Sequence, residues 1–290
     1  MLKRKLTRTK YYGHGLLLLA TISGINMTQD ITPGINLQSK SSNVVLSDTG
    51  ILQLQDLDSS LIIKKAVAEK AIAEASMIPM NPHVVKFVKD YLRKNNETLE
   101  LVKKRSDRYF KIIDPVFQKH GLPIELKYLA VIESELKATA VSRVGAAGPW
   151  QFMPATARIL GLKVSGKRDD RKHYYRSTVA AAIYLKDLYK EFGDWLLVIA
   201  AYNGGPGRVY YAMRKSGSKN FWKLQNYLPA ETRNHVKRFI GTHYYFEDRG
   251  SLVTLTKSEI NARNKAIAEL ESQTIQESTE TQILSAIIDR

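Results

Sequence analysis

A central helix is predicted over residues 121–136, GLPIELKYLAVIESEL. Pro123 follows a glycine stop signal and occupies the position of a first helical residue. At about 100° per residue, Glu133 shares its face with a largely apolar set, and Glu135 lies about 200° away. That set consists of Leu122, Leu126, Leu129, Ala130, Leu136 and the polar Lys137. The periodicity therefore predicts a carboxylate on the apolar face of a buried helix.

The position of Glu133 has two interpretations. Burying an ionised carboxylate is costly unless it is paired, and the usual response is a raised pKa. A carboxylic acid that stays protonated near neutral pH is what a general acid requires. The structural alternative is a buried glutamate that bonds to the backbone or extends past Lys137 to solvent. Helix geometry alone leaves both open.

The surrounding sequence predicts further helices and no sheet. Apolar residues recur at helical spacing over 84–94, 99–119, 178–191 and 195–202. No strand-like alternation is found between residues 80 and 250. We expect a mainly α domain of about 170 residues.

Composition and the first residues limit the class of protein. The chain has 290 residues, no cysteine and 44% hydrophobic residues, enough for a real core. Without cysteine, disulfide scaffolds, thiolate zinc sites, cysteine nucleophiles and a lipid-modified N-terminal cysteine are excluded. Five cations precede a short apolar stretch at residues 16–25, which is the layout of a secretory signal. We expect residues 1–27 to be a signal peptide or an N-terminal anchor, and the protein to be exported to the periplasm or cell envelope.

Two polar flanks border the domain at residues 80–250. Residues 28–79 are predicted to be a flexible linker with a short helix at 61–76, and residues 251–290 a partly helical, low-complexity tail. Most of the net charge of +16 lies in the domain. A basic domain suits a polyanionic partner, and neither zinc-finger spacing nor an RNA-binding aromatic signature favours nucleic acid.

Two glycine-containing motifs follow the predicted helix. Residues 140–156 read AVSRVGAAGPWQFMPAT, with a new helix expected from Met153, and residues 200–209 read AAYNGGPGRV. Gly145 and Gly148 allow a ligand to approach the backbone closely. Trp150 and Gln151 offer a stacking face and an amide, a common way to hold a sugar. The residues of the first string, taken singly, are also found in ordinary loops, and the second string alone is more often a plain helix end than a site.

Taken together, Glu133-Ser134 and these two motifs resemble the lytic transglycosylases, bacterial enzymes with a goose-lysozyme-like helical catalytic domain. The resemblance covers about residues 80–246 and is closest to the membrane-bound murein transglycosylase D type, which shares the Pro-x-Glu-Thr segment found here at residues 229–232. Pro149 departs from the larger apolar residue usual at its position.

The resemblance implies a site and a reaction. Glu133 would protonate the oxygen between N-acetylmuramic acid and N-acetylglucosamine, then take the proton of the sugar's 6-hydroxyl as a 1,6-anhydro ring closes. The implied substrate-binding residues are Ser142, Gly148, Trp150, Gln151, Tyr202, Asn203 and Glu231. Tyr202 would bond near Glu133 or the substrate, and Trp150 would stack on a sugar. Acidic peptidoglycan would be the partner of the basic domain, with membrane association through residues 1–27.

Two other functions are compatible with the sequence. A hydrolytic muramidase on the same fold would need a second carboxylate to activate water, and Asp169, Asp170 or Glu231 are candidates. A non-catalytic cell-wall-binding protein is the other. The six histidines, at positions 14, 83, 120, 173, 235 and 243, form no metal-ligand pattern, so we expect no cofactor.

Overall fold

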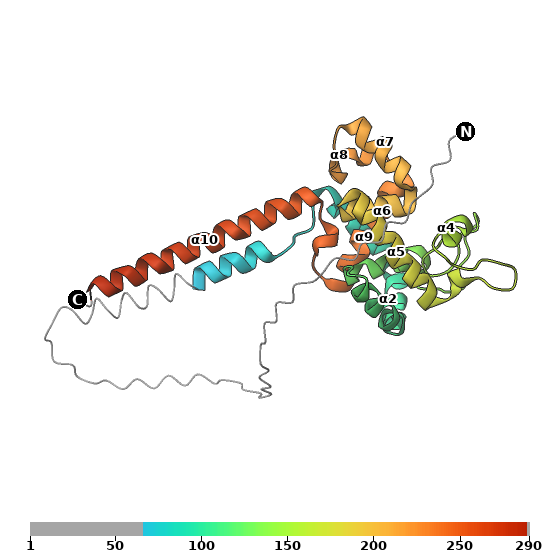
Figure 1. Cartoon of the computed structure of the whole chain (residues 1–290), viewed down its shortest axis with the longest axis horizontal. Coiled ribbons are helices and arrows are strands. Elements are labelled where there is room, and N and C mark those ends of the chain that lie inside the picture. The colour runs from blue at the N-terminus through green and yellow to red at the C-terminus, as the bar shows by residue number, and fades with distance from the viewer. Residues whose placement is uncertain (1–65, 289–290) are drawn as a thin grey trace, which may run out of the picture. The chain divides into compact units, whose positions relative to one another are not determined.

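The computed structural model describes residues 66–288, and every regular element in that range is helical (Figure 1). The predicted mainly α fold is confirmed there, whereas residues 1–27 and most of the predicted linker lie outside the described residues. In chain order the elements are residues 66–76, α2 (Pro82–Lys119), η1 (Ile124–Lys127), α3 (Tyr128–Ser134), α4 (Pro154–Ile159), η2 (Asp170–Lys172), α5 (Tyr174–Phe192), α6 (Trp195–Gly204), α7 (Pro206–Ser216), α8 (Phe221–Leu224), η3 (Gln225–Tyr227), α9 (Ala230–Glu247), η4 (Leu252–Thr254) and α10 (Lys257–Ile288).

Helix α2 replaces the two helices predicted at 84–94 and 99–119. Asn81 begins it by accepting a hydrogen bond from the His83 amide at 2.9 Å. The polar residues at the expected break are satisfied within the helix: the Asn95 amide donates to the Tyr91 carbonyl at 2.7 Å, and Asn96 bonds to Glu100 at 2.8 Å. Side chains that usually compete with helical bonds therefore do not interrupt α2.

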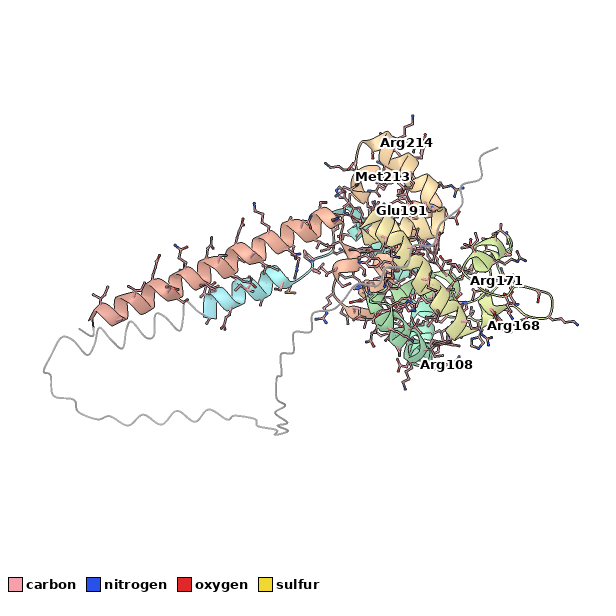
Figure 2. All side chains as sticks on the ribbon, viewed as in Figure 1. Arg108, Arg168, Arg171, Glu191, Met213 and Arg214 are labelled. Carbon is pink, nitrogen blue, oxygen red and sulfur yellow. The ribbon has the colours of Figure 1, made fainter. Side chains whose placement is uncertain are left out.

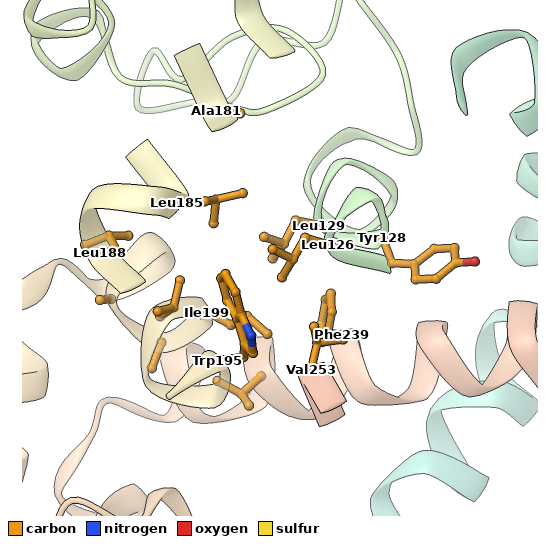
Figure 3. Packing of buried hydrophobic residues seen from close by; sticks show 14 of the residues in the cluster. Leu126, Tyr128, Leu129, Ala181, Leu185, Leu188, Trp195, Ile199, Phe239 and Val253 are labelled. Atoms are coloured by element: carbon orange, nitrogen blue, oxygen red, sulfur yellow. The ribbon is translucent and has the colours of Figure 1, made fainter. Parts of the chain in front are cut away.

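The core is centred on α6, which is buried on all sides from Trp195 to Ala201. Helices α5, α7 and α9 pack around it. Figure 3 shows how these elements meet the η1–α3 segment: Leu126 and Leu129 face Leu185 of α5 and Phe239 of α9. A helix apolar on every face is typical of the interior of a domain, so α6 and the helices around it form a rigid support for the loops at their ends.

In the C-terminal flank, α10 extends beyond the predicted helical segment and includes the low-complexity residues 271–282. Its first turns contact the domain. The Trp222 indole of the domain donates to Glu259 at 3.3 Å, and Arg263 donates at 2.7 Å to the carbonyl of Ser76, the last residue of the helix at 66–76. In the described part of the chain, no helix is both long and apolar enough to cross a membrane.

Asp194 joins α6 to the start of α10. Its Oδ1 accepts the amides of Leu196 at 2.9 Å and Leu197 at 3.2 Å, and its Oδ2 accepts the Lys257 amide at 2.6 Å. The Asp194 side chain is buried, so water could not take over as the acceptor for these amides if the carboxylate were removed. One carboxylate thus caps the central helix and ties the flank to the domain.

We expect Asp194→Ala to lower the free energy of unfolding by about 1–3 kcal/mol, because it removes a helix cap and leaves buried amides without an acceptor. Urea unfolding followed by circular dichroism measures the loss. The control is Asp187→Ala on α5, whose exposed carboxylate pairs with Lys190; this change should alter stability by less than about 0.5 kcal/mol. Equal losses in the two variants would contradict the capping role.

Candidate active site

Glu133 lies in the last turn of α3, a helix much shorter than the one predicted. Helical geometry ends at Ser134, and Glu135 and Leu136 adopt left-handed φ angles of 53° and 62°. The predicted helical face, which included Leu136 and Lys137, is therefore wrong beyond Ser134. The predicted contrast between the two glutamates nevertheless holds: the side chain of Glu133 is 15% exposed, and that of Glu135 is 43% exposed and paired with Lys137 at 2.6 Å.

The end of α3 is anchored to the following loop by Ser134. Its buried hydroxyl lies 2.9 Å from the Pro149 carbonyl and 3.1 Å from the Ala130 carbonyl. On the other side, the Arg105 guanidinium donates to the Glu135 carbonyl at 2.7 Å. These bonds hold the turn that carries Glu133.

The surroundings of Glu133 favour its protonated form. Burial raises the pKa of its carboxyl to about 8, against the opposing charge of Arg238 and with a smaller contribution from the charge of Glu231. Desolvation penalises the charged carboxylate, which is why it dominates here. Glu133 is thus mainly a neutral acid near pH 7, with part of its side chain open to a ligand.

A histidine that the sequence analysis considered only as a metal ligand lies against this carboxyl. His235 of α9 is 1% exposed, and its Nε2 is 3.4 Å from Oε1 of Glu133. Burial and the nearby Arg238 lower the pKa of His235 to about 3, so the ring is neutral. His235 lies on the buried face of α9 together with Thr232 and Phe239. This helical spacing is the feature of the sequence that could have placed His235 in the interior.

Tyr202 lies in the last turn of α6. Its hydroxyl donates to the Trp150 carbonyl at 2.7 Å. Burial and the charge of Glu133 raise the pKa of Tyr202 well above its usual value, so it stays a neutral donor. Tyr202 is therefore close enough to be influenced by the charge of Glu133, while its hydroxyl bonds to the Trp150 carbonyl; its contact with the substrate stays a prediction.

The indole of Trp150 is a core group rather than a sugar platform. The side chain is fully buried, Nε1 donates to Thr178 at 3.1 Å, and the ring packs 5.5 Å from that of Phe117. No face is open to a ligand, so the predicted stacking role is corrected. The buried indole of Trp150 anchors the loop in the core, and its backbone carbonyl accepts the hydrogen bond from Tyr202.

Gly148 is likewise structural rather than a point of ligand approach. Its φ is +82°, and a Cβ there would lie 1.8 Å from the Arg171 carbonyl oxygen. The Arg171 guanidinium in turn donates to the carbonyls of Gly145 at 2.7 Å and Phe152 at 3.0 Å. The close approach that requires glycine is made by the protein's own backbone.

Asp169 and Asp170 are engaged in ion pairs that support this loop (Figure 2 labels two of the arginines). Asp169 binds Arg171 with both oxygens, at 2.9 and 2.7 Å, and Asp170 accepts from Arg168 at 2.8 Å and Arg176 at 3.2 Å. These bonds lower the pKa of both carboxyls. A carboxylate held in this way is a poor base, which argues against either residue as the carboxylate that activates water in a muramidase.

The remaining predicted residues lie at the ends of the loop and of α6. The Ser142 hydroxyl accepts a hydrogen bond from the backbone amide of Ala146 at 2.9 Å. Gln151 has a left-handed backbone φ of 46°, and its side-chain Nε2 donates to the Gly148 carbonyl at 2.8 Å. Asn203 follows Tyr202 and is half-buried, and Glu231 is exposed in the first turn of α9. In residues 66–288, no group of three or more potential ligands is arranged to hold a metal ion.

Comparison with known proteins confirms the resemblance to lytic transglycosylases. Residues 113–225 match the family of the Transglycosylase SLT domain. Membrane-bound lytic murein transglycosylase D of Escherichia coli strain K12 is 38% identical over 168 residues, which are 56% of this chain and 36% of that protein. Peptidoglycan transglycosylase gp16 of Escherichia phage T7 is 34% identical over 145 residues, covering 46% of this chain and 11% of that protein.

Among solved structures, the 70 kDa soluble lytic transglycosylase of Escherichia coli is similar over 58% of this chain and 31% of that chain, with 23% identity and a TM-score of 0.43. The chain spans about a third of the length of the first curated relative it matches.

The raised pKa of Glu133 makes folding stability depend on pH. Its folded pKa of about 8 exceeds the ordinary 4.5, so its contribution to stability is complete at low pH and is lost as pH rises through 8. We expect Glu133→Gln to match wild type near pH 4 and to be more stable at pH 9 by on the order of 5 kcal/mol, because the pKa differs by about 3.5 units between the folded and unfolded states and each unit corresponds to about 1.4 kcal/mol. Urea unfolding at both pH values measures this, and Glu135→Gln is the control that should show no such gain.

The packing above Gly148 predicts a difference between two glycines of one loop. Gly148→Ala should destabilise the protein by about 3 kcal/mol or more, because the new methyl group meets backbone that cannot move aside. Gly145 has a similar φ of +86°, but no atom lies within 4 Å of the place that a Cβ would occupy. Gly145→Ala should cost only the left-handed strain, about 1–2 kcal/mol. Thermal unfolding of both variants measures the difference, and equal costs would contradict the role of the Arg171 carbonyl.

Proposed function

We propose that this protein is a peptidoglycan lytic transglycosylase that cleaves the β-1,4 bond between N-acetylmuramic acid and N-acetylglucosamine and leaves a 1,6-anhydro ring. The observation that carries the proposal is the carboxyl of Glu133, which is largely buried and protonated near neutral pH at the end of a short, anchored helix. The family match over residues 113–225 includes this helix and the loop after it.

The proposed reaction needs one carboxyl in two protonation states. Glu133 donates its proton to the bridging oxygen, the glycosidic bond breaks, and positive charge develops at the anomeric carbon. The resulting carboxylate takes the proton of the 6-hydroxyl of the same sugar, and that oxygen bonds to the anomeric carbon. No water is consumed. Because the attack is intramolecular, the oriented hydroxyl has the advantage of proximity.

The groups around Glu133 have separate proposed roles. Tyr202 fixes the loop through the Trp150 carbonyl and contributes a neutral hydroxyl near the acid. Ser142, Gln151 and Asn203 would hold polar groups of the sugars. Gln151 would bind the sugar through its side-chain oxygen, as an acceptor, because its side-chain nitrogen already donates to two backbone carbonyls of the loop.

A muramidase is the second candidate function, and Glu231 is the residue that favours it. Its carboxylate is exposed and its charge raises the pKa of Glu133, so the two carboxyls are electrostatically coupled. A hydrolase would use such a second carboxylate to activate water. The product of the reaction separates the two functions.

The organisation of the chain follows from this proposal. Residues 80–250 would be the catalytic domain, acting on glycan strands in the cell envelope. The basic charge of the chain, +16 overall, suits peptidoglycan, whose stem peptides and lactyl groups are acidic. Residues 1–27 would direct export or anchor the protein to the membrane.

We expect the full-length protein to release muropeptides from purified peptidoglycan that are one water lighter than hydrolysis products and carry anhydro ends, as measured by mass spectrometry. Glu133→Gln should lower the rate by about 100-fold or more, because the acid is lost. Glu231→Gln should still yield anhydro products.

Two controls accompany this digestion. Glu135→Gln removes a nearby carboxylate that faces solvent and should retain activity within about threefold of wild type. Hydrated reducing ends whose release requires Glu231 would establish the muramidase instead. Binding to peptidoglycan with no release by wild type would indicate a cell-wall-binding protein.

A further inference from the structure

His235 has a buried nitrogen that lacks a hydrogen-bond partner of good geometry within residues 66–288. That nitrogen, Nε2, faces Oε1 of Glu133 at 3.4 Å. Leaving a buried donor or acceptor unpaired is costly, so this orientation needs a reason. Contacts to a catalytic group are often long in the free enzyme and shorten when charge develops.

The neighbouring Arg238 settles which nitrogen of His235 carries the proton. Its Nη2 is 3.5 Å from Nδ1 of the ring. A guanidinium only donates hydrogen bonds, so Nδ1 presents its lone pair there. The ring is neutral, because burial and Arg238 hold the pKa of His235 at about 3. Its single proton therefore lies on Nε2 and points at the carboxyl of Glu133.

We infer that His235 is a positioning residue for Glu133: the Nε2–H donates to Oε1, so the acidic proton resides on Oε2 and is presented to the substrate. This inference rests on the proposed function, in which Glu133 gives up and recovers that proton. After proton donation the same N–H faces a carboxylate, and a hydrogen bond to an ionised oxygen is about twice as strong as one to a neutral oxygen. His235 thus supports the charged form at the step where it appears.

The other charged groups around Glu133 do not replace this contact. On α9, Arg238 and Glu231 act on the carboxyl in opposite directions. On α6, Tyr202 directs its hydroxyl to the Trp150 carbonyl. Beyond the end of α3, Glu135 is paired with Lys137 and Arg105. Within residues 66–288, the contact to Oε1 comes from Nε2 of His235.

Two substitutions separate the donor from the shape of the side chain. His235→Phe keeps a buried ring and removes the N–H, whereas His235→Gln restores an N–H donor that reaches a similar position. With purified peptidoglycan and the full-length protein, we expect His235→Phe to lower kcat by about 10- to 100-fold, the effect of one hydrogen bond to a charged group, with KM within about threefold of wild type. His235→Gln should recover kcat to within about fivefold of wild type.

The pKa of Glu133 gives a readout that does not depend on activity. NMR titration of ¹³C-labelled glutamate carboxyls, with Glu133 assigned through Glu133→Gln, should show its pKa raised in His235→Phe, because the ionised form has lost a donor. In His235→Gln that pKa should return towards the wild-type value. A purely structural histidine would leave the titration unchanged.

His243 provides the matched control. It is a fully buried histidine on the same helix, and its Nε2 bonds to Ser251 at 2.8 Å rather than to Glu133. His243→Phe should lower stability without moving the pKa of Glu133. The inference is overturned if His235→Phe leaves both kcat and that pKa unchanged, or if His235→Phe, His235→Gln and His243→Phe lose activity equally and in step with stability.

The titration and the digestion also distinguish this inference from the proposed function. If wild type released no muropeptides but His235→Phe still raised the pKa of Glu133, the transglycosylase function would fail and the positioning of Glu133 by His235 would stand. If wild type released anhydro muropeptides but His235→Phe changed neither kcat nor the pKa of Glu133, the transglycosylase function would stand and the positioning role of His235 would fail.

Discussion

Burial of the Glu133 carboxyl is the constraint to which the rest of the site is fitted. The cost of desolvation raises the pKa of this group to about 8, and the charge of Arg238 offsets part of that cost. The ring of His235 lies 3.4 Å from the carboxyl and is neutral. An arginine paired directly with the carboxyl would instead have kept it ionised. The arrangement is compatible with an acid that must hold its proton until a substrate takes it.

Such an acid is useful only if its support is rigid, and the neighbouring loop supplies that rigidity. Ser134 and Tyr202 both bond to carbonyls of the loop, at Pro149 and Trp150. Arg171 spans the loop through two more carbonyls. Several residues of the motif, such as Trp150 and Gly148, therefore support the backbone of the loop rather than contacting a ligand.

The buried helices explain why these loops meet at one place. Helix α6 is apolar on every side and ends at Tyr202, Asn203 and the glycines that follow, while α9 passes beside it and carries His235. A Cβ at Gly204 would lie 2.7 Å from the Thr232 hydroxyl, so the end of α6 can approach α9 only with glycine there. Close packing of α6 and α9 thus holds the end of α6, which carries Tyr202, next to the helix whose His235 contacts Glu133.

The sequence by itself determined the helical class, the apolar face on which Glu133 lies and the motifs that resemble lytic transglycosylases, because helical periodicity and turn residues are local properties. It could not determine where α3 ends, since the left-handed turn at Glu135 is stabilised by Arg105 from a distant part of the chain. Nor could it show that Trp150 and Gly148 have structural roles rather than ligand-binding ones. The contact between His235 and Glu133, about a hundred residues apart, was equally beyond it. Exposure and contact between distant residues depend on how the helices pack, and only the tertiary structure decided them.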